Sequence, residues 1–193
     1  ILGSIGQSPV TTLGTTAAGN VTYTNPEVAF IYNILSEVNK DIQNEGWHFN
    51  REDHIKVTPD VNKQISIPNT YLRYDLHNGH NRTMDVVRRN GKLYDLVQHT
   101  YEFDDDVYLD VTYLFTFENI PPVFQRYVIA RSCVRAATQL VSNPQLVQLL
   151  QVQEAQARAA CMEYECDQGD HTFFGVPHES SYLPYQPYNA LRR

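Results

Sequence analysis

The apolar residues after the first turn signals recur every three or four positions, which is the spacing of one face of an α-helix. Asn25 and Pro26 precede this stripe and suit the cap and the first turn of a helix. Gly46 follows the stripe and is expected to end the helix. The sequence therefore predicts an amphipathic helix between Asn25 and Gly46, with an inward stripe of Ile31, Leu35, Val38 and Ile42.

From Trp47 to Phe117 the pattern changes to short β-branched and aromatic runs separated by turn residues, which is typical of an antiparallel sheet. The clearest local signal is Asn90-Gly91, because both residues tolerate positive φ and lie between two strand-like runs. We expect a hairpin there, with its register fixed by the turn. The predicted strands are His48–Asn50, Ile55–Thr58, Gln64–Ile67, Leu72–Asp75, Thr83–Arg89, Leu93–Val97 and Val107–Phe115.

Helical spacing returns after Pro121-Pro122, and Asn143-Pro144 then repeats the Asn-Pro start signal. The third helix should be mostly buried, because its stripe is wide; the stripe comprises Val123, Phe124, Tyr127, Val128, Ile129, Ala130, Val134, Ala137 and Val141. Glu154 and Arg158 form an i, i+4 pair on the fourth helix. Its inward residues are predicted to be Leu146, Leu149, Leu150, Ala157, Cys161 and Tyr164.

The order of helices, strands and helices predicts an α+β fold in which a sheet is inserted into a helical bundle. The bundle is discontinuous, because both ends of the chain build it. We expect the bundle to comprise residues 1–46 and 118–166, the β-rich antiparallel insertion residues 47–117, and an extended C-terminal arm residues 167–193.

The charge and the cysteine count exclude several classes of protein. Asp and Glu number 22 against 15 Lys and Arg, a formal net charge of −7, which argues against a general nucleic-acid binder. No apolar run approaches the roughly 20 residues that span a bilayer, and no secretory signal is expected. Three cysteines are too few for a disulfide framework, and we expect Cys133 and Cys161 to be buried reduced thiols.

No constellation of residues predicts catalysis, a metal or a cofactor. Glu163 and Glu165 are two positions apart on a helix and point to different sides. The acidic run Asp104–Asp106 lacks the spacing of a calcium loop and favours a solvated turn. The run His77–His80 could pinch a metal, but no third ligand is indicated. Known nucleophile, zinc and phosphate-loop motifs are absent from the sequence.

The segment from Asp167 onward has several prolines and no amphipathic period, so it should form no core of its own. Tyr182, Tyr185 and Tyr188 recur every third residue, which would align their rings along one edge of a polyproline II arm. We expect these tyrosines, with Arg192 and Arg193, to dock on a partner subunit. The alternative is a disordered tail whose tyrosines are incidental.

Three stretches of the chain, Ile1–Leu13, Ile42–Asn50 and Ala159–Gly169, are characteristic in their order and spacing. Pro59-Asp60 and Ile120–Phe124 lie between them and extend the pattern along most of the chain. Together these segments resemble tail tubular protein A, the tail adaptor of short-tailed double-stranded DNA bacteriophages (podoviruses). The resemblance implies a structural virion protein and not an enzyme.

The resemblance further implies a dodecameric ring that joins the portal protein to the tail nozzle, tail tubular protein B, at the portal vertex of the virion. Such a ring would contribute to the DNA ejection conduit and the fibre-attachment region, and would assemble in the host cytoplasm. Double-stranded DNA would pass through its lumen without specific binding, since an acidic lumen repels phosphates. The alternative is a tail-associated hydrolase of polysaccharide or peptidoglycan, which would need two converging carboxylates.

A ring needs a heterologous interface, in which one patch of each subunit meets a different patch of the next. The candidate anchors are Phe30, Tyr32 and Tyr127, for which an ordinary core position is an equally open interpretation. Trp47 is expected to hold the sheet against the bundle. The basic residues of the strand region are interpreted as exposed strand positions in preference to DNA contacts; they are Arg51, Arg73, Arg82, Arg88 and Arg89.

Overall fold

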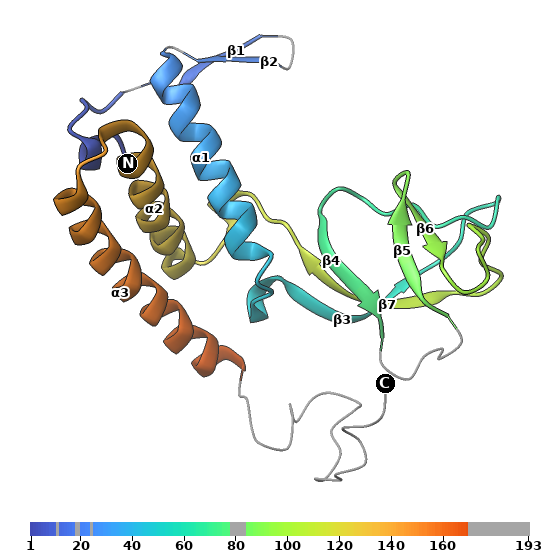
Figure 1. Cartoon of the computed structure of the whole chain (residues 1–193). Coiled ribbons are helices and arrows are strands. Elements are labelled where there is room, and N and C mark those ends of the chain that lie inside the picture. The colour runs from blue at the N-terminus through green and yellow to red at the C-terminus, as the bar shows by residue number, and fades with distance from the viewer. Residues whose placement is uncertain (11, 18–19, 24, 78–83, 170–193) are drawn as a thin grey trace. The chain divides into compact units, whose positions relative to one another are not determined.

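The computed structural model describes the chain except residues 11, 18–19, 24, 78–83 and 170–193 (Figure 1). It contains three α-helices and short antiparallel strands, which confirms the predicted α+β class. The chain divides into two compact units. We call the first, Ile1–Ile42 with Thr116–Glu165, the helical unit, and the second, built on Gln43–Phe115, the sheet unit.

The helical unit contains the three α-helices and a small hairpin that the sequence analysis did not predict. Asn25 begins α1 as expected, because its Oδ1 accepts a hydrogen bond from the Glu27 amide at 3.1 Å. The helix ends at Gln43, before the predicted Gly46. The elements are η1 (Leu2–Ile5), β1 (Gly14–Ala17), β2 (Asn20–Tyr23), α1 (Pro26–Gln43), η3 (Phe117–Asn119), α2 (Pro122–Ala136), the π-helical turn η4 (Ala137–Val141) and α3 (Pro144–Gly169).

Helix α2 lies between α1 and α3, and side chains join it to both neighbours (Figure 1). Arg135 of α2 lies 3.2 Å from Asp41 and 3.3 Å from Glu37 of α1. On the other side, Arg158 of α3 donates to the Tyr127 hydroxyl at 2.8 Å. Helices α1 and α3 therefore occupy opposite sides of α2 within the helical unit.

The buried residues of the helical unit confirm part of the predicted stripes. Ile31, Val38 and Ile42 are buried on α1, and Leu35 is partly buried. Cys133 and Cys161 are buried free thiols, as expected. The prediction for α3 was wrong at one position, because Leu149 is 66% exposed. Only one side of α3 is covered by α2, so the inward face is narrower than the hydrophobic pattern suggested.

The sheet unit is built from a three-stranded and a two-stranded antiparallel sheet. The three-stranded sheet has the order β3-β7-β4, and the two-stranded sheet is the predicted hairpin. Asn90 and Gly91 have φ values of 53° and 75°, as the hairpin turn requires. The strands are β3 (Arg51–Val57), β4 (Tyr71–Leu76), β5 (Val86–Arg89), β6 (Lys92–Asp95) and β7 (Val107–Tyr113).

Two predicted strands were wrong. His48–Asn50 is a short 3₁₀ helix, η2, because the Asn50 side chain accepts a hydrogen bond from the Trp47 amide at 2.8 Å and closes a turn. The run Gln64–Ile67 forms only an isolated bridge between Ser66 and Lys92. Pro68 follows this run and has no amide hydrogen with which to continue a ladder.

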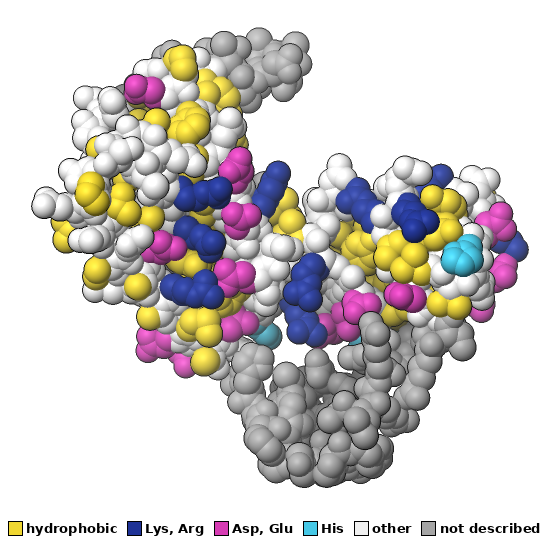
Figure 2. Space-filling view, viewed as in Figure 1, with side chains coloured by type: hydrophobic (Ala, Val, Ile, Leu, Met, Phe, Trp, Pro, Cys, Tyr) yellow, Lys and Arg dark blue, Asp and Glu magenta, His cyan; other side chains and the backbone are white. Residues whose placement is uncertain are grey.

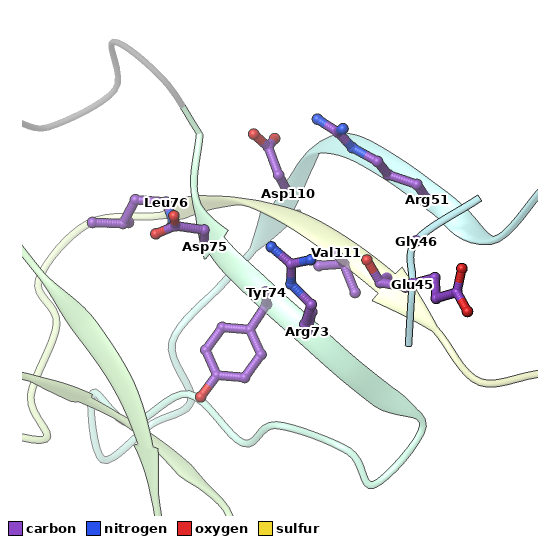
Figure 3. A pocket seen from close by; sticks show the side chains of 10 residues that line it. Glu45, Gly46, Arg51, Arg73, Tyr74, Asp75, Leu76, Asp110 and Val111 are labelled. Carbon is purple, nitrogen blue, oxygen red and sulfur yellow. The ribbon is translucent and has the colours of Figure 1, made fainter. Parts of the chain in front are cut away.

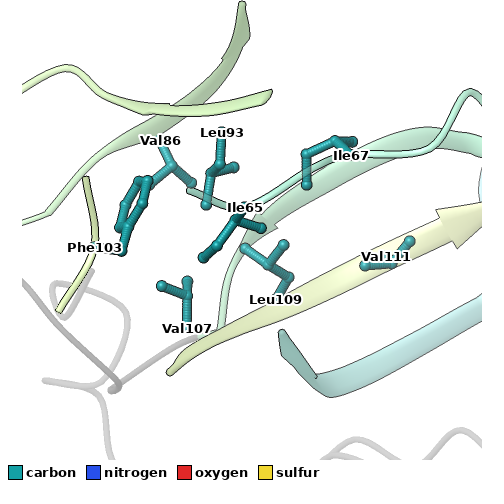
Figure 4. Close-up of a cluster of buried hydrophobic side chains, with 8 residues drawn as sticks. All are labelled: Ile65, Ile67, Val86, Leu93, Phe103, Val107, Leu109 and Val111. Carbon is teal, nitrogen blue, oxygen red and sulfur yellow. The ribbon is translucent and has the colours of Figure 1, made fainter. Parts of the chain in front are cut away.

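The sheet unit has a compact apolar core (Figure 4). On β7 every second residue points into it, as strand geometry requires. Ile65 also enters the core although its run is not a regular strand, and Leu93 lies opposite it on β6. The buried members are Ile65, Ile67, Val86, Leu93, Phe103, Val107, Leu109 and Val111.

Two tyrosines of the sheet unit should make its stability sensitive to alkali. Burial and a hydrogen bond with Tyr71 raise the pKa of Tyr113, and burial also raises the pKa of Tyr74. As pH rises past the ordinary value of 10.0, the unfolded chain loses these protons before the folded chain does. The contribution of these tyrosines to the free energy of unfolding is therefore fully present below pH 10 and decreases as the pH rises above it.

Urea unfolding followed through the single tryptophan, Trp47, should show this fall between neutral and strongly alkaline pH. The variant Tyr113→Phe removes one of the two protons and should flatten the dependence. An unfolding midpoint with the same alkaline dependence in both proteins would contradict the assignment to Tyr113.

Candidate interaction surfaces

A polar cleft of about 280 Å³ opens on the sheet unit (Figure 3). The Glu45-Gly46 turn forms one wall, and strands β4 and β7 form its floor. Gly46 has a φ of 81°, a conformation that other residues rarely adopt. The lining residues are Glu45, Gly46, Arg51, Arg73, Tyr74, Asp75, Leu76, Asp110, Val111 and Thr112.

The strand register brings two of the sequence-predicted arginines to this cleft. Arg51 of β3 and Arg73 of β4 both pair with Thr112 of the central strand β7. Directly paired residues of antiparallel strands share a face, so the two guanidinium groups flank Thr112. Asp75 pairs with Asp110 two positions further along the same strands. The cleft therefore carries charges of both signs and suits a polar protein surface better than a polyanion.

Asp110 has a structural role at one end of the cleft. Its Oδ1 accepts hydrogen bonds from the His54 amide at 2.9 Å and the His77 ring at 2.7 Å. His54 has a φ of 61° and lies where the β3–β7 register shifts. The His54 ring stacks on Tyr108 with centroids 4.4 Å apart. The Asp110 carboxylate thus stabilises a β-bulge in which His54 has an unfavourable backbone conformation, and the Tyr108 ring packs against the same residue.

The other candidates for metal binding do not form a site in the described part of the chain, where no group of three metal-ligating side chains occurs. His77 is bound to Asp110, and residues 78–80 of the predicted His77–His80 run lie outside the described residues. Asp104 and Asp106 form exposed ion pairs with Lys63 at 2.6 Å and Lys56 at 2.7 Å. These lysines lower the pKa of both carboxyls. The acidic run is therefore a solvated turn.

The three predicted interface anchors occupy different environments. Phe30 and Tyr32 are 39% and 42% exposed on α1, and the Tyr32 ring packs against Tyr23. Tyr127 is only 1% exposed. Its hydroxyl accepts hydrogen bonds from Arg158 at 2.8 Å and Arg131 at 3.3 Å. Tyr127 is thus a core residue of the helical unit, and Phe30 and Tyr32 are available at its surface.

A family model described as tail tubular protein matches residues 1–171. The chain belongs to the tail tubular protein family. This confirms the resemblance found in the sequence, and it makes the protein a structural component of a bacteriophage tail that assembles with other tail components. No individual curated protein matches the chain.

Not every sequence-predicted site of this tail tubular protein can be located in the structure. Tyr182, Tyr185, Tyr188, Arg192 and Arg193 lie outside the described residues. Among the basic residues, Arg82 also lies outside them. Within the described residues, no helix combines the length and apolarity needed to cross a membrane.

An apolar face of α3 is a surface that the sequence analysis missed. Leu149 and Val152 are 66% and 57% exposed on one side of α3, and Met162 is 46% exposed on a different side. Exposed alanines and glutamines lie between them, and no charged residue occurs from Pro144 to Gln153. In the sequence, this surface corresponds to an apolar pattern on α3 that is wider than a single neighbouring helix can cover.

Proposed function

We propose that the protein is the subunit of a tail adaptor ring that joins the portal protein to the tail nozzle. In this role it contributes to the DNA ejection conduit and to the fibre-attachment region at the portal vertex. The proposal extends the family assignment, which establishes a structural tail protein. The resemblance to tail adaptors supports a dodecamer assembled in the host cytoplasm, with DNA passing through without sequence-specific binding.

The size of the chain supports a ring of many copies. A compact body of 193 residues would have a radius of gyration of about 16 Å, and each of the two units is smaller than that. Neither unit can enclose a passage for a DNA duplex by itself. A tube made from this chain therefore needs repeated subunits, each with two different surfaces that join head to tail.

The observation that carries the proposal is the presence of exposed apolar side chains on both outer helices of the helical unit. On α3 these are Leu149 and Val152, three positions apart and on one side of the helix; on α1 they are Phe30 and Tyr32, which lie on different sides of the helix. Helix α2 lies between α1 and α3 (Figure 1), so the two outer helices can offer two unlike surfaces. Two unlike surfaces are what a head-to-tail ring requires.

The substitution Val152→Glu is expected to weaken ring assembly by about 100-fold or more, because an unpaired charge buried in an interface costs about 3–5 kcal/mol. The matched control is Gln151→Glu, which adds the same charge about 100° around the helix. Native mass spectrometry of the purified protein and electron microscopy of tailed particles measure the assembled rings, and circular dichroism verifies the fold.

Equal assembly of both variants would place the subunit interface elsewhere. Intact particles without a circular oligomer of this chain at the capsid vertex would overturn the proposed function itself.

A further inference from the structure

The β5–β6 hairpin carries three cations that form no ion pair with a carboxylate of the described residues. Arg88 donates a hydrogen bond to the amide oxygen of Asn69, and Lys92 donates to the amide oxygen of Gln64 at 2.5 Å. The Arg89 guanidinium lies over the Tyr94 ring, 4.2 Å from its centroid. Each partner is a neutral group, so all three side chains are held in place while keeping their full charge.

Most other cations of the described residues are bound to carboxylates. Lys56 and Lys63 pair with Asp106 and Asp104, Arg51 with Asp53, and Arg135 with Glu37 and Asp41. Figure 2 shows Lys and Arg side chains of the helical unit among Asp and Glu; on the sheet unit some basic side chains lie beside hydrophobic ones and others beside Asp and Glu. The hairpin is therefore a local positive surface on an acidic protein.

The carboxylates closest in sequence to the hairpin do not neutralise its positive charges. Asp95 of β6 is 1% exposed, and its carboxylate accepts hydrogen bonds from the amides of Val97 and Gln98 at 2.7 and 3.3 Å. Asp85 precedes β5, and within the described residues it makes no ion pair with the hairpin cations. Because Asp95 is turned inward, the surface of the hairpin keeps its positive sign.

We propose that the β5–β6 hairpin contacts the phosphate groups of double-stranded DNA. Arg89 and Lys92 are directly paired across the hairpin and share one face, whereas Arg88 pairs with the buried Leu93 and lies on the other face. Tyr94 lies on that face and packs edge-on against Tyr101, with ring centroids 4.8 Å apart. Guanidinium, ammonium and phenol groups are donors that proteins use to bind DNA phosphates.

DNA is favoured over an acidic protein segment because the proposed function brings a duplex past every subunit. The inference goes beyond that function, which assigns no residue to the DNA. The two cations on this face make a weak contact, and the surrounding acids limit it further at low salt. At physiological salt, each charge is screened over a distance of about 8 Å, so it acts mainly on groups close to it. The hairpin therefore touches phosphates loosely and lets the duplex slide.

Binding of the full-length chain to a short fluorescent DNA duplex tests the proposal through its salt dependence. Two neutralised phosphates give a slope of about −1.8 for log K against log salt, so affinity should fall about 12-fold over a fourfold rise in salt concentration. The triple variant Arg88→Gln, Arg89→Gln, Lys92→Gln should lose this dependence. Arg89→Gln and Lys92→Gln should each reduce the slope by about 0.9.

The matched control is Lys63→Gln with Asp104→Asn, which removes an exposed cation and its ion-pair partner without changing the net charge. It should leave the salt slope unchanged, because Lys63 is already neutralised. Overturning results are a triple variant with the slope of the wild type, or a wild type that binds no duplex at low salt. Hairpin-dependent binding of a polyglutamate peptide in place of the duplex would assign the surface to a protein partner and equally overturn the proposal.

Ring assembly of the triple variant is measured separately. Rings that form normally but no longer bind DNA support the inference. Wild-type protein that binds DNA through the hairpin but forms no ring would remove the proposed function and leave the phosphate contact standing.

Discussion

Replacing Asn50 by alanine is expected to destabilise the sheet unit by about 3–5 kcal/mol, because it removes three hydrogen bonds between a buried side chain and the backbone. The Asn50 side chain is 1% exposed. Its amide nitrogen donates to the carbonyl oxygens of Gln43 at 2.8 Å and Tyr113 at 2.9 Å. Its oxygen accepts from the Trp47 amide at 2.8 Å.

Urea unfolding followed by Trp47 fluorescence measures this effect, because the only tryptophan lies next to the altered bonds. The matched control is Asn62→Ala, which truncates an exposed asparagine of the same unit and should change stability by less than about 0.5 kcal/mol. Equal unfolding midpoints for the two variants would show that the Asn50 network does not stabilise the unit.

The position of this network explains why its loss should be so costly. The chain passes between the two units at Ile42-Gln43 and again at Phe115-Thr116. The Gln43 side chain joins these two crossings, because its amide donates to the Phe115 carbonyl at 2.9 Å and accepts from the Phe115 amide at 2.8 Å. Asn50 binds the backbone of Gln43 in turn. The buried side-chain amides of Gln43 and Asn50 thus connect the two ends of the segment Gln43–Phe115.

The elements that the sequence predicted well depend on neighbouring residues. The α1 stripe follows from helical spacing, and the β5–β6 hairpin follows from Asn90-Gly91. The η2 turn was missed because it depends on contacts distant in sequence, since Asn50 bonds to Tyr113, 63 residues away. Local β propensity could not reveal that bond.

The candidate surfaces were predicted less well for a related reason. A sequence shows that Arg88, Arg89 and Lys92 are basic, but it does not show which cations are paired. Lys56 and Lys63 are neutralised by a turn that lies more than 40 residues further along the chain. Likewise, Leu149 belongs to the apolar pattern of α3, and only the tertiary arrangement shows that α2 leaves it exposed.

The largest effect in the helical unit is expected from Phe124→Ala. Phe124 is 0% exposed in the first turn of α2, and its ring packs edge-on against Tyr164 of α3 with centroids 6.0 Å apart. Next to this contact, the Cys161 thiol of α3 lies 3.5 Å from the Val123 carbonyl oxygen of α2. Removing a buried phenyl ring leaves a cavity and costs about 3–5 kcal/mol.

Circular dichroism at a helix-sensitive wavelength measures this loss during urea unfolding, while Trp47 fluorescence follows the sheet unit in the same samples. The matched control is Ile129→Ala on the same helix, where the side chain is 40% exposed and the cost should stay below about 1 kcal/mol. If only the helical signal shifts in Phe124→Ala, the units unfold independently; if both signals shift together, they unfold as one. A Phe124→Ala protein as stable as Ile129→Ala would contradict the packing of α3 on α2, and with it the two-sided helical layer on which the proposed ring depends.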